Sequence, residues 1–432
     1  MGNISYFCIV KHLYAFFLAF LLLIPLSTKA YTIEDRPAGT DTLAGESRVR
    51  ISLLTCSPHD EVYSLYGHTA LRVEDPRRGM DLAVNYGMFS FAKPFFVLRF
   101  VFGLTDYEMG IVPFEVFCRE YEYYGSSVTQ QTINLTETEK QRIIDALLEN
   151  YKPENRVYRY NFYYDNCTTR ACDMVTENID GKVVYDNTID DGMTMRQMLH
   201  RLNNGSPWSS LGNDLLLGIG ADRPLHGDDT RALPLSAMRA MEKAYIVGSD
   251  GVRRKLVEET SIPVREGRQW IGDGFPLTPV QCSAILLAVV ALLSLLEWKM
   301  GRYMWMLDAL LLTSIGICGL IITAMIGSQH PTVRTNIQIL LFNPIPLLFG
   351  WKAISNRMRG RCHWMWKTGA VMICLMVVLF AFEIQWLDPA VKILSVTVML
   401  RYALGIVADE RVKARQKTQS GQKAARRGAG PC

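Results

Sequence analysis

Cys167 is the residue whose surroundings best suit nucleophilic chemistry. It follows an aromatic, strand-like stretch and the pair Asp165-Asn166, which is typical of a helix N-cap. A helix that begins at Cys167 places the sulfur at the positive end of the helix dipole, where the pKa of a thiol is lowered. Arg170, one turn later, is expected to add to this effect. The alternative is a buried structural cysteine at a strand–helix junction.

The base that a thiol nucleophile needs is predicted to be His68. This residue follows a glycine at the start of a predicted strand, and a turn rich in Pro, Arg and Gly leads into the next strand. Counting outward from the centre of that turn places residue 68 opposite about residue 87 on the next strand. The register therefore brings Asn85 and Tyr86 near His68.

Asn85 is predicted to hydrogen-bond the second imidazole nitrogen and to fix the ring, as the third member of a triad does. The alternative for His68 is a strand histidine that is hydrogen-bonded but has no catalytic role. The other histidines of this half lie in loop-like sequence and are expected at the surface, namely His59, His200 and His226.

These residues belong to a stretch, residues 31–275, with the pattern of a mixed α+β domain. Strands are predicted over residues 48–55, 69–74, 82–86 and 157–164. Thr136 and Glu139 form a capping-box pattern, which predicts a helix over 136–150, and a second helical stripe covers 167–179. Beyond residue 180, helices and loops rich in Gly, Asn and Pro are expected, without a clear motif.

The first thirty residues have the features of a secretory signal peptide. A basic pair precedes the apolar run Leu13–Leu26, which is short for a membrane span, and small residues lead up to Ala30. Cleavage after Ala30 is therefore predicted, with an uncleaved anchor as the alternative. In both cases the domain that follows is exported.

Residues 276–408 are predicted to be a membrane domain of five helical spans. The spans are Gln281–Trp298, Tyr303–Ile326, Asn336–Trp351, Thr368–Trp386 and Ala390–Val407. Lys and Arg are concentrated after spans one and three and in the tail, residues 409–432, whereas the other two loops hold one Arg in total. By the positive-inside rule, the N-terminal domain is outside and the basic tail is cytoplasmic. Tryptophans near the span ends are typical of an aromatic belt.

The composition excludes some classes of function. The chain has 432 residues and a formal charge of +4, with 46 Lys and Arg against 42 Asp and Glu. Apolar residues are concentrated in the C-terminal part, which excludes a single soluble globule, and the small net charge argues against binding to nucleic acid. No spacing of Cys and His suits zinc, so neither a metal nor another cofactor is predicted.

Several segments together resemble the bacterial Lnb-type lipoprotein N-acyltransferases. The order of a strand His, a polar residue on the next strand and a Cys opening a helix is also that of circularly permuted papain-like enzymes, such as NlpC-type peptidases and the lecithin:retinol acyltransferase (LRAT) group. The resemblance is carried by the segments Ser64–Val73, Asn85–Phe89 and Tyr160–Arg170 and by His330-Pro331, Asn336 and Asn343-Pro344. It implies a permuted papain-like exported domain followed by the membrane domain.

The resemblance also implies an activity. Enzymes of this family move an acyl chain from the diacylglyceryl group of a lipoprotein to the α-amine of its N-terminal cysteine, with a Cys–His pair. Diacylglyceryl-modified lipoproteins or phospholipids are the expected partners, and the bacterial cytoplasmic membrane is the expected location. The backbone N–H of Cys167 is expected to hold the oxyanion, with Asn166 or Tyr66 as further donors. His330 and Asn336 form a candidate site at the membrane side, or else a network of caps and loop hydrogen bonds.

Two other functions are compatible with the same sequence features. A membrane-anchored thiol amidase that acts on the cell wall would use the same Cys–His pair, although one anchor would suffice for it. A non-catalytic envelope assembly protein would have Cys167 paired with Cys172. Because these two lie five residues apart on one predicted helix, their directions diverge too far for easy disulfide geometry.

Overall fold

The structure, a computed structural model, describes residues 49–59, 64–89, 94–185, 190–203, 206–268 and 275–428. The predicted signal peptide lies outside these ranges.

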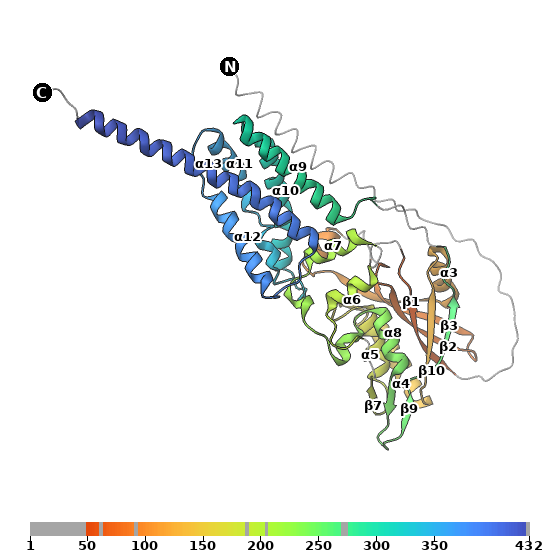
Figure 1. Cartoon of the computed structure of the whole chain (residues 1–432). Coiled ribbons are helices and arrows are strands. Elements are labelled where there is room, and N and C mark those ends of the chain that lie inside the picture. The colour runs from red at the N-terminus through yellow and green to blue at the C-terminus, as the bar shows by residue number, and fades with distance from the viewer. Residues whose placement is uncertain are drawn as a thin grey trace. The chain divides into compact units, whose positions relative to one another are not determined.

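An antiparallel sheet of seven strands forms the centre of the α/β domain (Figure 1). The strand order is β10-β5-β1-β2-β3-β4-β6, with β1 Arg50–Cys56, β2 His68–Asp75, β3 Met80–Met88, β4 Asp106–Pro113, β5 Val128–Ile133, β6 Val157–Arg159 and β10 Val257–Val264. Alternating side chains of the central strands are apolar on both faces, so both faces are covered. The predicted strands at 48–55, 69–74 and 82–86 correspond to β1, β2 and β3.

Helices cover the two faces of this sheet unequally. One face packs against α4 Glu137–Tyr151, α5 Cys167–Thr176 and α8 Pro234–Lys243 in the larger core, whereas the other packs against α3 Phe114–Tyr124. Leu71 of β2 belongs to the larger core, while its neighbour Ala70 lies in the core beneath α3. Because side chains alternate between the faces, α5 lies over the Leu71 face of β2. The first turn of α5, with Cys167, lies at the His68 end of that strand, where the hydroxyls of Thr69 and Thr168 are 3.1 Å apart.

Two predicted boundaries were wrong for local reasons. The strand predicted over 157–164 ends at Arg159, because the side-chain oxygen of Asn161 accepts hydrogen bonds from the backbone N–H groups of Tyr163 and Tyr164 and turns the chain. The helix predicted to reach residue 179 ends at Thr176. By contrast, the capping box at Thr136 is present and begins α4 as predicted.

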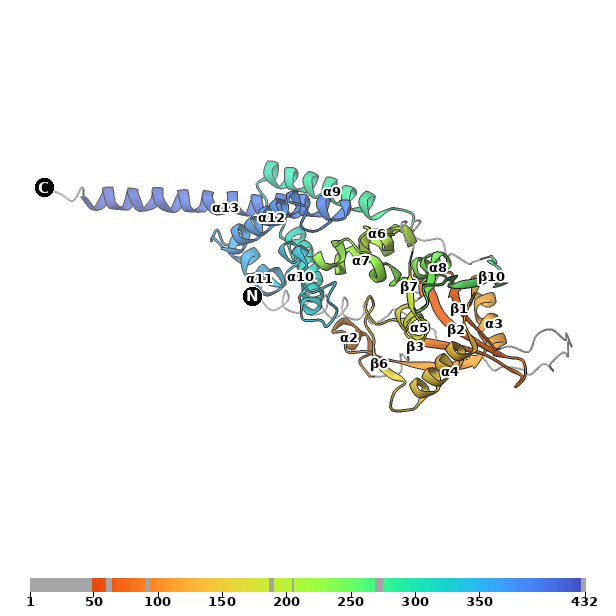
Figure 2. The same ribbon diagram turned by 90° about the horizontal axis from the view of Figure 1, so that it is seen from below.

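The segment 180–275 holds more regular structure than was predicted. It contains α6 Met195–Leu202, α7 Pro207–Leu216, the 3-10 helices η2 Ile219–Asp222 and η3 Gly227–Arg231, and a small sheet of β7 Lys182–Val184, β8 Tyr245–Val247 and β9 Arg253–Lys255. It also supplies β10, an edge strand of the main sheet. Figure 2 shows α6 and α7 between the sheet and the apolar helices, and Leu211, Leu215 and Ile219 pack into the core of the latter.

The C-terminal domain consists of apolar helices, as predicted. They are α9 Pro279–Met300, α10 Trp305–Ile326, α11 Ile345–Met358, α12 Met365–Ala381 and α13 Pro389–Gly428. Within the described residues, four helical segments are long and apolar enough to cross a membrane, and α12 is a shorter apolar helix. The third predicted span is broken, because the 3-10 helix η4 Ile337–Leu340 and α11 are separated at Asn343-Pro344. The fourth ends at Ala381, five residues before its predicted end at Trp386.

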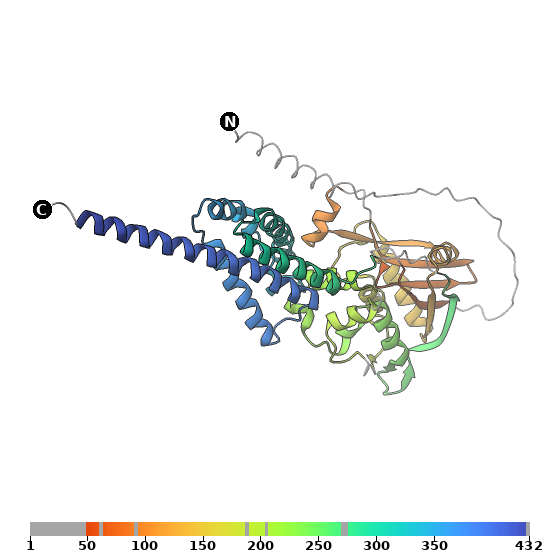
Figure 3. The same ribbon diagram turned by 45° about the horizontal axis from the view of Figure 1, so that its top comes forward.

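The basic tail is not a separate element. Helix α13 continues without a break through the predicted boundary at residue 408, and Figure 3 shows it as one long helix that leaves the bundle. The sequence beyond Val407 is rich in Lys, Arg, Gln and Ala, which are strong helix formers, so the apolar span propagates into a polar helix.

Four charged side chains form a neutral cluster among the apolar helices. Arg401 of α13 contacts Asp308 of α10 at 2.6 Å and Glu297 of α9 at 2.9 Å, while Arg357 of α11 contacts the same two carboxylates at 3.2 and 2.5 Å. All four side chains are at most 9% exposed. Two positive and two negative charges cancel, which is the condition for placing them in a medium of low dielectric constant.

Removal of one of these charges is expected to destabilise the helical domain. Arg401→Met leaves two buried carboxylates with a single guanidinium, and the expected loss is about 3–5 kcal/mol of the free energy of unfolding. Lys413→Met on the same helix removes a partner of an exposed ion pair and should barely change the melting temperature. The measurement is thermal unfolding of both variants in detergent. Equal melting temperatures for the two variants would contradict the role of the buried cluster.

Candidate functional site

Helix α5 begins at Cys167 because Asn166 caps it. The side-chain oxygen of Asn166 accepts hydrogen bonds from the backbone N–H groups of Thr168 and Thr169, at 2.7 and 3.0 Å. The hydroxyl of Thr169 in turn accepts from the backbone N–H of Asn166, which completes a reciprocal capping box. The thiol therefore lies in the first turn of the helix, as the sequence predicted.

His68 and Asn85 meet through the register of strands β2 and β3. Ala70 pairs with Asn85, so His68, two residues before Ala70, lies on the same face as Asn85. Nε2–H of His68 donates to Oδ1 of Asn85 at 2.9 Å. Nδ1 is thereby left for the thiol of Cys167, with which the His68 ring is hydrogen-bonded. The structure thus brings together the three residues that were predicted as a triad.

The surroundings of Cys167 stabilise its thiolate. Burial by itself would raise the pKa of the thiol. The positive charge and hydrogen bond of His68 oppose this, together with hydrogen bonds from the backbone N–H of Thr69 and the hydroxyl of Thr168. The net result is a pKa of Cys167 below its ordinary value.

The pKa of the His68 imidazole is shifted in the other direction, upward. Burial lowers the pKa of His68, but the thiolate charge of Cys167 and the hydrogen bonds to Cys167 and Asn85 outweigh burial and raise the pKa above its ordinary value. Both shifts favour the thiolate–imidazolium pair over the neutral one.

The other cysteines of the α/β domain have thiol pKa values above the ordinary value. Burial raises the pKa of Cys118 to about 11 and that of Cys172 to about 12, and it raises the pKa of Cys56 as well. Cys167 and Cys172 are both free thiols, so the disulfide expected for a non-catalytic protein is absent from the described structure. Among the four cysteines of this domain, Cys167 differs from the others in having a lowered pKa.

A glycine on β3 leaves room at the thiol. Gly87 has φ +91°, which L side chains rarely adopt, and a Cβ built there would lie 3.6 Å from Cβ of Cys167 and 3.8 Å from the ring of Tyr107. A side chain at this position would occupy the space between Cys167 and Tyr107. The sequence contains this glycine in the Asn85–Phe89 segment, but its proximity to Cys167 depends on the packing of α5.

Three predicted supporting residues already have other partners. Both amide hydrogens of Asn166 bond to carbonyls, of Phe162 and Ala232, so its side chain supports the helix and has no donor left for an oxyanion. The Tyr66 hydroxyl accepts a hydrogen bond from Asn213. Arg170 is held by Asp165 at 2.8 Å and stacks on the ring of Tyr158, so it steadies the start of α5 and does not bond the thiol.

Asn336 lies in a network that joins the α/β domain to the helical domain. Its amide donates to the carbonyl of Leu215, and its oxygen accepts from the amides of Gln338 and Gln385. Asn336 also caps η4, so it belongs to the cap and loop network that was the alternative prediction for it. His330 is 6% exposed and packs near the ring of Phe100, at 5.9 Å between centroids.

This junction also holds a buried ionic group that the sequence did not predict. Arg196 of α6 is 1% exposed and pairs with Asp214 of α7 at 2.8 Å and with Asp222 of η2 at 2.6 Å. His200, predicted to lie at the surface, bonds Asp214 at 2.9 Å and packs against Trp386 of the helical domain. No local motif joins these residues, because they are 14 to 26 positions apart on separate elements.

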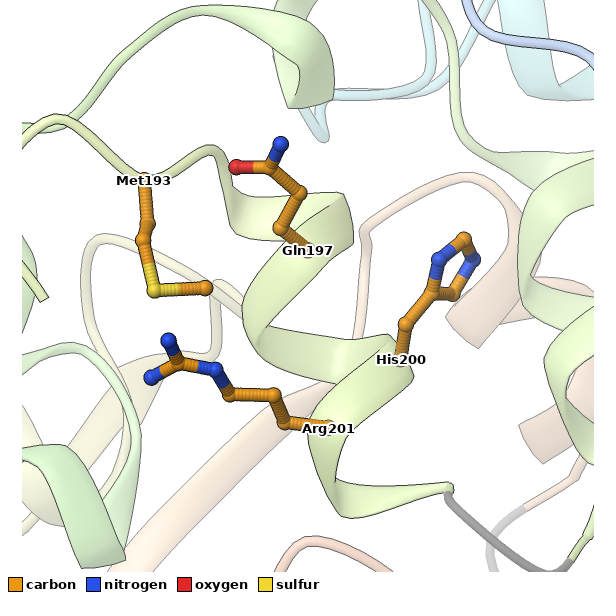
Figure 4. Close-up of a pocket in the computed structure, with 4 residues that line it drawn as sticks. All are labelled: Met193, Gln197, His200 and Arg201. Atoms are coloured by element: carbon orange, nitrogen blue, oxygen red, sulfur yellow. The ribbon is translucent and has the colours of Figure 1, made fainter.

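A shallow pocket of about 610 Å³ lies beside this ionic group, lined by Met193, Gln197, His200 and Arg201 (Figure 4). It contains none of the residues that surround Cys167. Arg201 is held by Asp190 at 3.0 Å, and His200 is held by Asp214. We therefore interpret the pocket as part of the junction and not as the reaction site.

The shifted pKa values predict how alkylation of Cys167 depends on pH. The reactive form is the thiolate, so the rate with iodoacetamide should rise through a midpoint below that of an ordinary thiol, about 8.5. His68→Ala removes the imidazolium and leaves the burial, so its midpoint should lie above the ordinary value. Mass spectrometry of alkylated peptides measures this, with Cys118 and Cys172 as controls that react only at higher pH. A wild-type midpoint at or above that of a free thiol would contradict the geometry.

Comparisons with protein families match both parts of the chain. Residues 40–201 match the family model described as the Lnb N-terminal periplasmic domain, and residues 271–412 match that of the Lnb transmembrane domain. Comparisons with curated proteins and with solved structures find no match. The two matched regions lie on the mixed α/β domain and on the apolar helices, so the N-terminal domain is periplasmic and the C-terminal domain is embedded in the membrane. The chain therefore belongs to the Lnb-type family of lipoprotein N-acyltransferases and has its two-domain architecture.

Proposed function

We propose that this protein transfers an acyl chain from the sn-2 ester of a diacylglyceryl lipid to the α-amine of a lipoprotein's N-terminal cysteine, through a thioester on Cys167. The observation that carries the proposal is the hydrogen-bonded series Cys167–His68–Asn85 in a domain hydrogen-bonded directly to a membrane domain. A thiol with a lowered pKa, an adjacent base and a residue that orients the base are the parts that covalent acyl transfer requires.

The first half-reaction forms the thioester. His68 holds the thiol proton of Cys167, and the thiolate attacks the ester carbonyl. The N–H groups of Thr168 and Thr169 are taken by the cap, so the backbone N–H of Cys167 is the donor for the developing oxyanion, which the helix dipole also stabilises. The tetrahedral intermediate then breaks its bond to the glycerol oxygen, which leaves as an alcohol after taking the proton from the imidazolium of His68.

The second half-reaction uses the amine as nucleophile. The neutral α-amine attacks the thioester carbonyl, and His68 accepts a proton from the attacking nitrogen. The intermediate expels the thiolate of Cys167, an amide is formed, and the lipid is left in its lyso form. Water would hydrolyse the same thioester, so transfer requires a site from which water is excluded. A site next to the bilayer meets this requirement.

The proposal includes an orientation in the cytoplasmic membrane. The distribution of Lys and Arg supports an N-terminal domain on the periplasmic side and a cytoplasmic C-terminus. The substrate amine and the sn-2 ester are then on the same side as the thiol. Cys167, His68 and Asn85 are the catalytic residues of the proposal. The helix cap of Asn166, the Asp165–Arg170 pair and the contact of Tyr66 with Asn213 support them.

Substitutions of the pair test the proposal. Cys167→Ala should abolish N-acylation while the protein still inserts, and Cys167→Ser should do the same because its hydroxyl has a far higher pKa. His68→Ala should lower the rate by about 10²–10⁴-fold through loss of general base catalysis. Asn85→Ala should cost less, since it removes the orientation of the ring and not the base. The measurement is mass spectrometry of lipoprotein N-termini from cells that depend on this chain for N-acylation.

Cys118→Ala is the matched control, because it removes a half-buried thiol of the same domain outside the site. It should leave N-acylation intact. Full N-acylation by Cys167→Ala would overturn the thioester mechanism. Cleavage of cell-wall peptides by the purified chain, with no change of lipoprotein N-termini, would instead indicate a thiol amidase.

A further inference from the structure

Aromatic rings lie in series between the catalytic thiol and the membrane domain. We call this series the aromatic row and define it as Tyr107, Phe89, Phe96, Phe100 and His330. Successive ring centroids are 4.9, 5.3, 6.4 and 5.9 Å apart. The row begins at the thiol, since the space beside Gly87 is bounded by both Cys167 and the ring of Tyr107.

The far end of the row is fixed to the membrane domain. The short helix α2, Phe96–Val101, carries Phe96 and Phe100, and the carbonyl of Phe102 accepts a hydrogen bond from the backbone N–H of Gln329 at 3.0 Å. Gln329 lies three residues after the end of α10, which is long and apolar enough to cross a membrane. Figure 2 shows α2 beside α10. The row therefore connects the end of a membrane span with the thiol.

Helix α2 exposes apolar side chains where it meets this span. Phe95 is 78% exposed, Leu98 55% and Phe100 38%. Phe95 also has φ +57°, an outlier for a bulky residue. The positive φ of Phe95 and the exposure of its ring to water are both unfavourable in free energy. Contact of the same ring with hydrocarbon would be favourable.

Among the described residues, the row itself carries no free charge. Arg99, the charged residue of α2, turns toward β4 and pairs with Asp106 at 3.2 Å. Nε2 of His330 has no hydrogen-bond partner among the described residues, and burial lowers the pKa of this imidazole, so the ring is neutral at pH 7. The described rings of the row are therefore uncharged, which suits contact with a hydrocarbon chain.

We propose that the aromatic row is the binding site of the acyl chain of the lipid donor, and that α2 contacts the outer leaflet and guides this chain to Cys167. This inference rests on the proposed function and deepens it, because it assigns the selection of long acyl chains to α2. A hydrocarbon chain is the occupant that fits, since the row is apolar and continuous from the end of a membrane span to the thiol.

The test compares two donors in the full-length protein in detergent micelles. One donor is a dipalmitoyl-glyceryl lipid, and the other is a dibutyryl-glyceryl analogue that is too short to reach α2. The rate of acyl-enzyme formation on Cys167 is followed by intact-protein mass spectrometry. Phe100→Ser should lower the rate with the palmitoyl donor by about tenfold, the loss expected for one apolar ring contact. It should leave the rate with the butyryl donor within about twofold of wild type, as expected if the thiol site is undisturbed.

Tyr123→Ser is the matched control, since Tyr123 is an aromatic residue of α3 that is 74% exposed and lies outside the row. It should change neither rate. An equal loss with both donors in Phe100→Ser, or no loss with either, would overturn the assignment of the acyl chain to the row. Absence of an acyl adduct on Cys167 with both donors in the wild type would overturn the proposed function, and the assignment of the row with it.

Discussion

The hydrogen bond between His68 and Cys167 is the interaction on which the candidate site depends. It joins the start of strand β2 to the start of helix α5, two points 99 residues apart in the chain. The contact requires α5 to pack on the sheet so that its first turn reaches the end of β2. Thr69 and Thr168, the residues next to the pair, are linked by their hydroxyls at 3.1 Å. The helix cap at Asn166 fixes the sulfur, and the β2–β3 register fixes the imidazole.

The junction between the periplasmic domain and the membrane domain adds a second constraint, because its contacts are polar and extensive. Backbone N–H groups of Gly218 and Ile219 donate to the carbonyls of Thr332 and Thr335 across the junction, both at 2.8 Å. Arg196, which is paired with Asp214 and Asp222, donates to the carbonyls of Leu217 and Gly218 next to these bonds. A junction of directional bonds sets the orientation of the two domains more narrowly than apolar contact alone would.

Residues 202–270 lie between the two family matches and contribute contacts to both domains. Helix α7 and η2 pack against the membrane helices, and β10 completes the sheet of the periplasmic domain. Separation of the two domains would therefore expose Leu211, Leu215 and Ile219, and it would remove the contacts of Trp386 with Arg196 and Asp222.

The sequence by itself determined the parts of the site that depend on local rules. The cap at Asn166 predicts where α5 starts. The turn between β2 and β3 places His68 and Asn85 near each other on one face of the hairpin. Hydropathy locates the apolar helices. These features follow from neighbours in the chain or from counting across one hairpin. Tertiary structure alone decided that Arg170 bonds Asp165 and that His200 joins the group around Arg196. It also decided that aromatic rings contact one another in series from Tyr107 to His330. Those contacts join residues on separate elements, and packing, which no local pattern encodes, determines which of them meet.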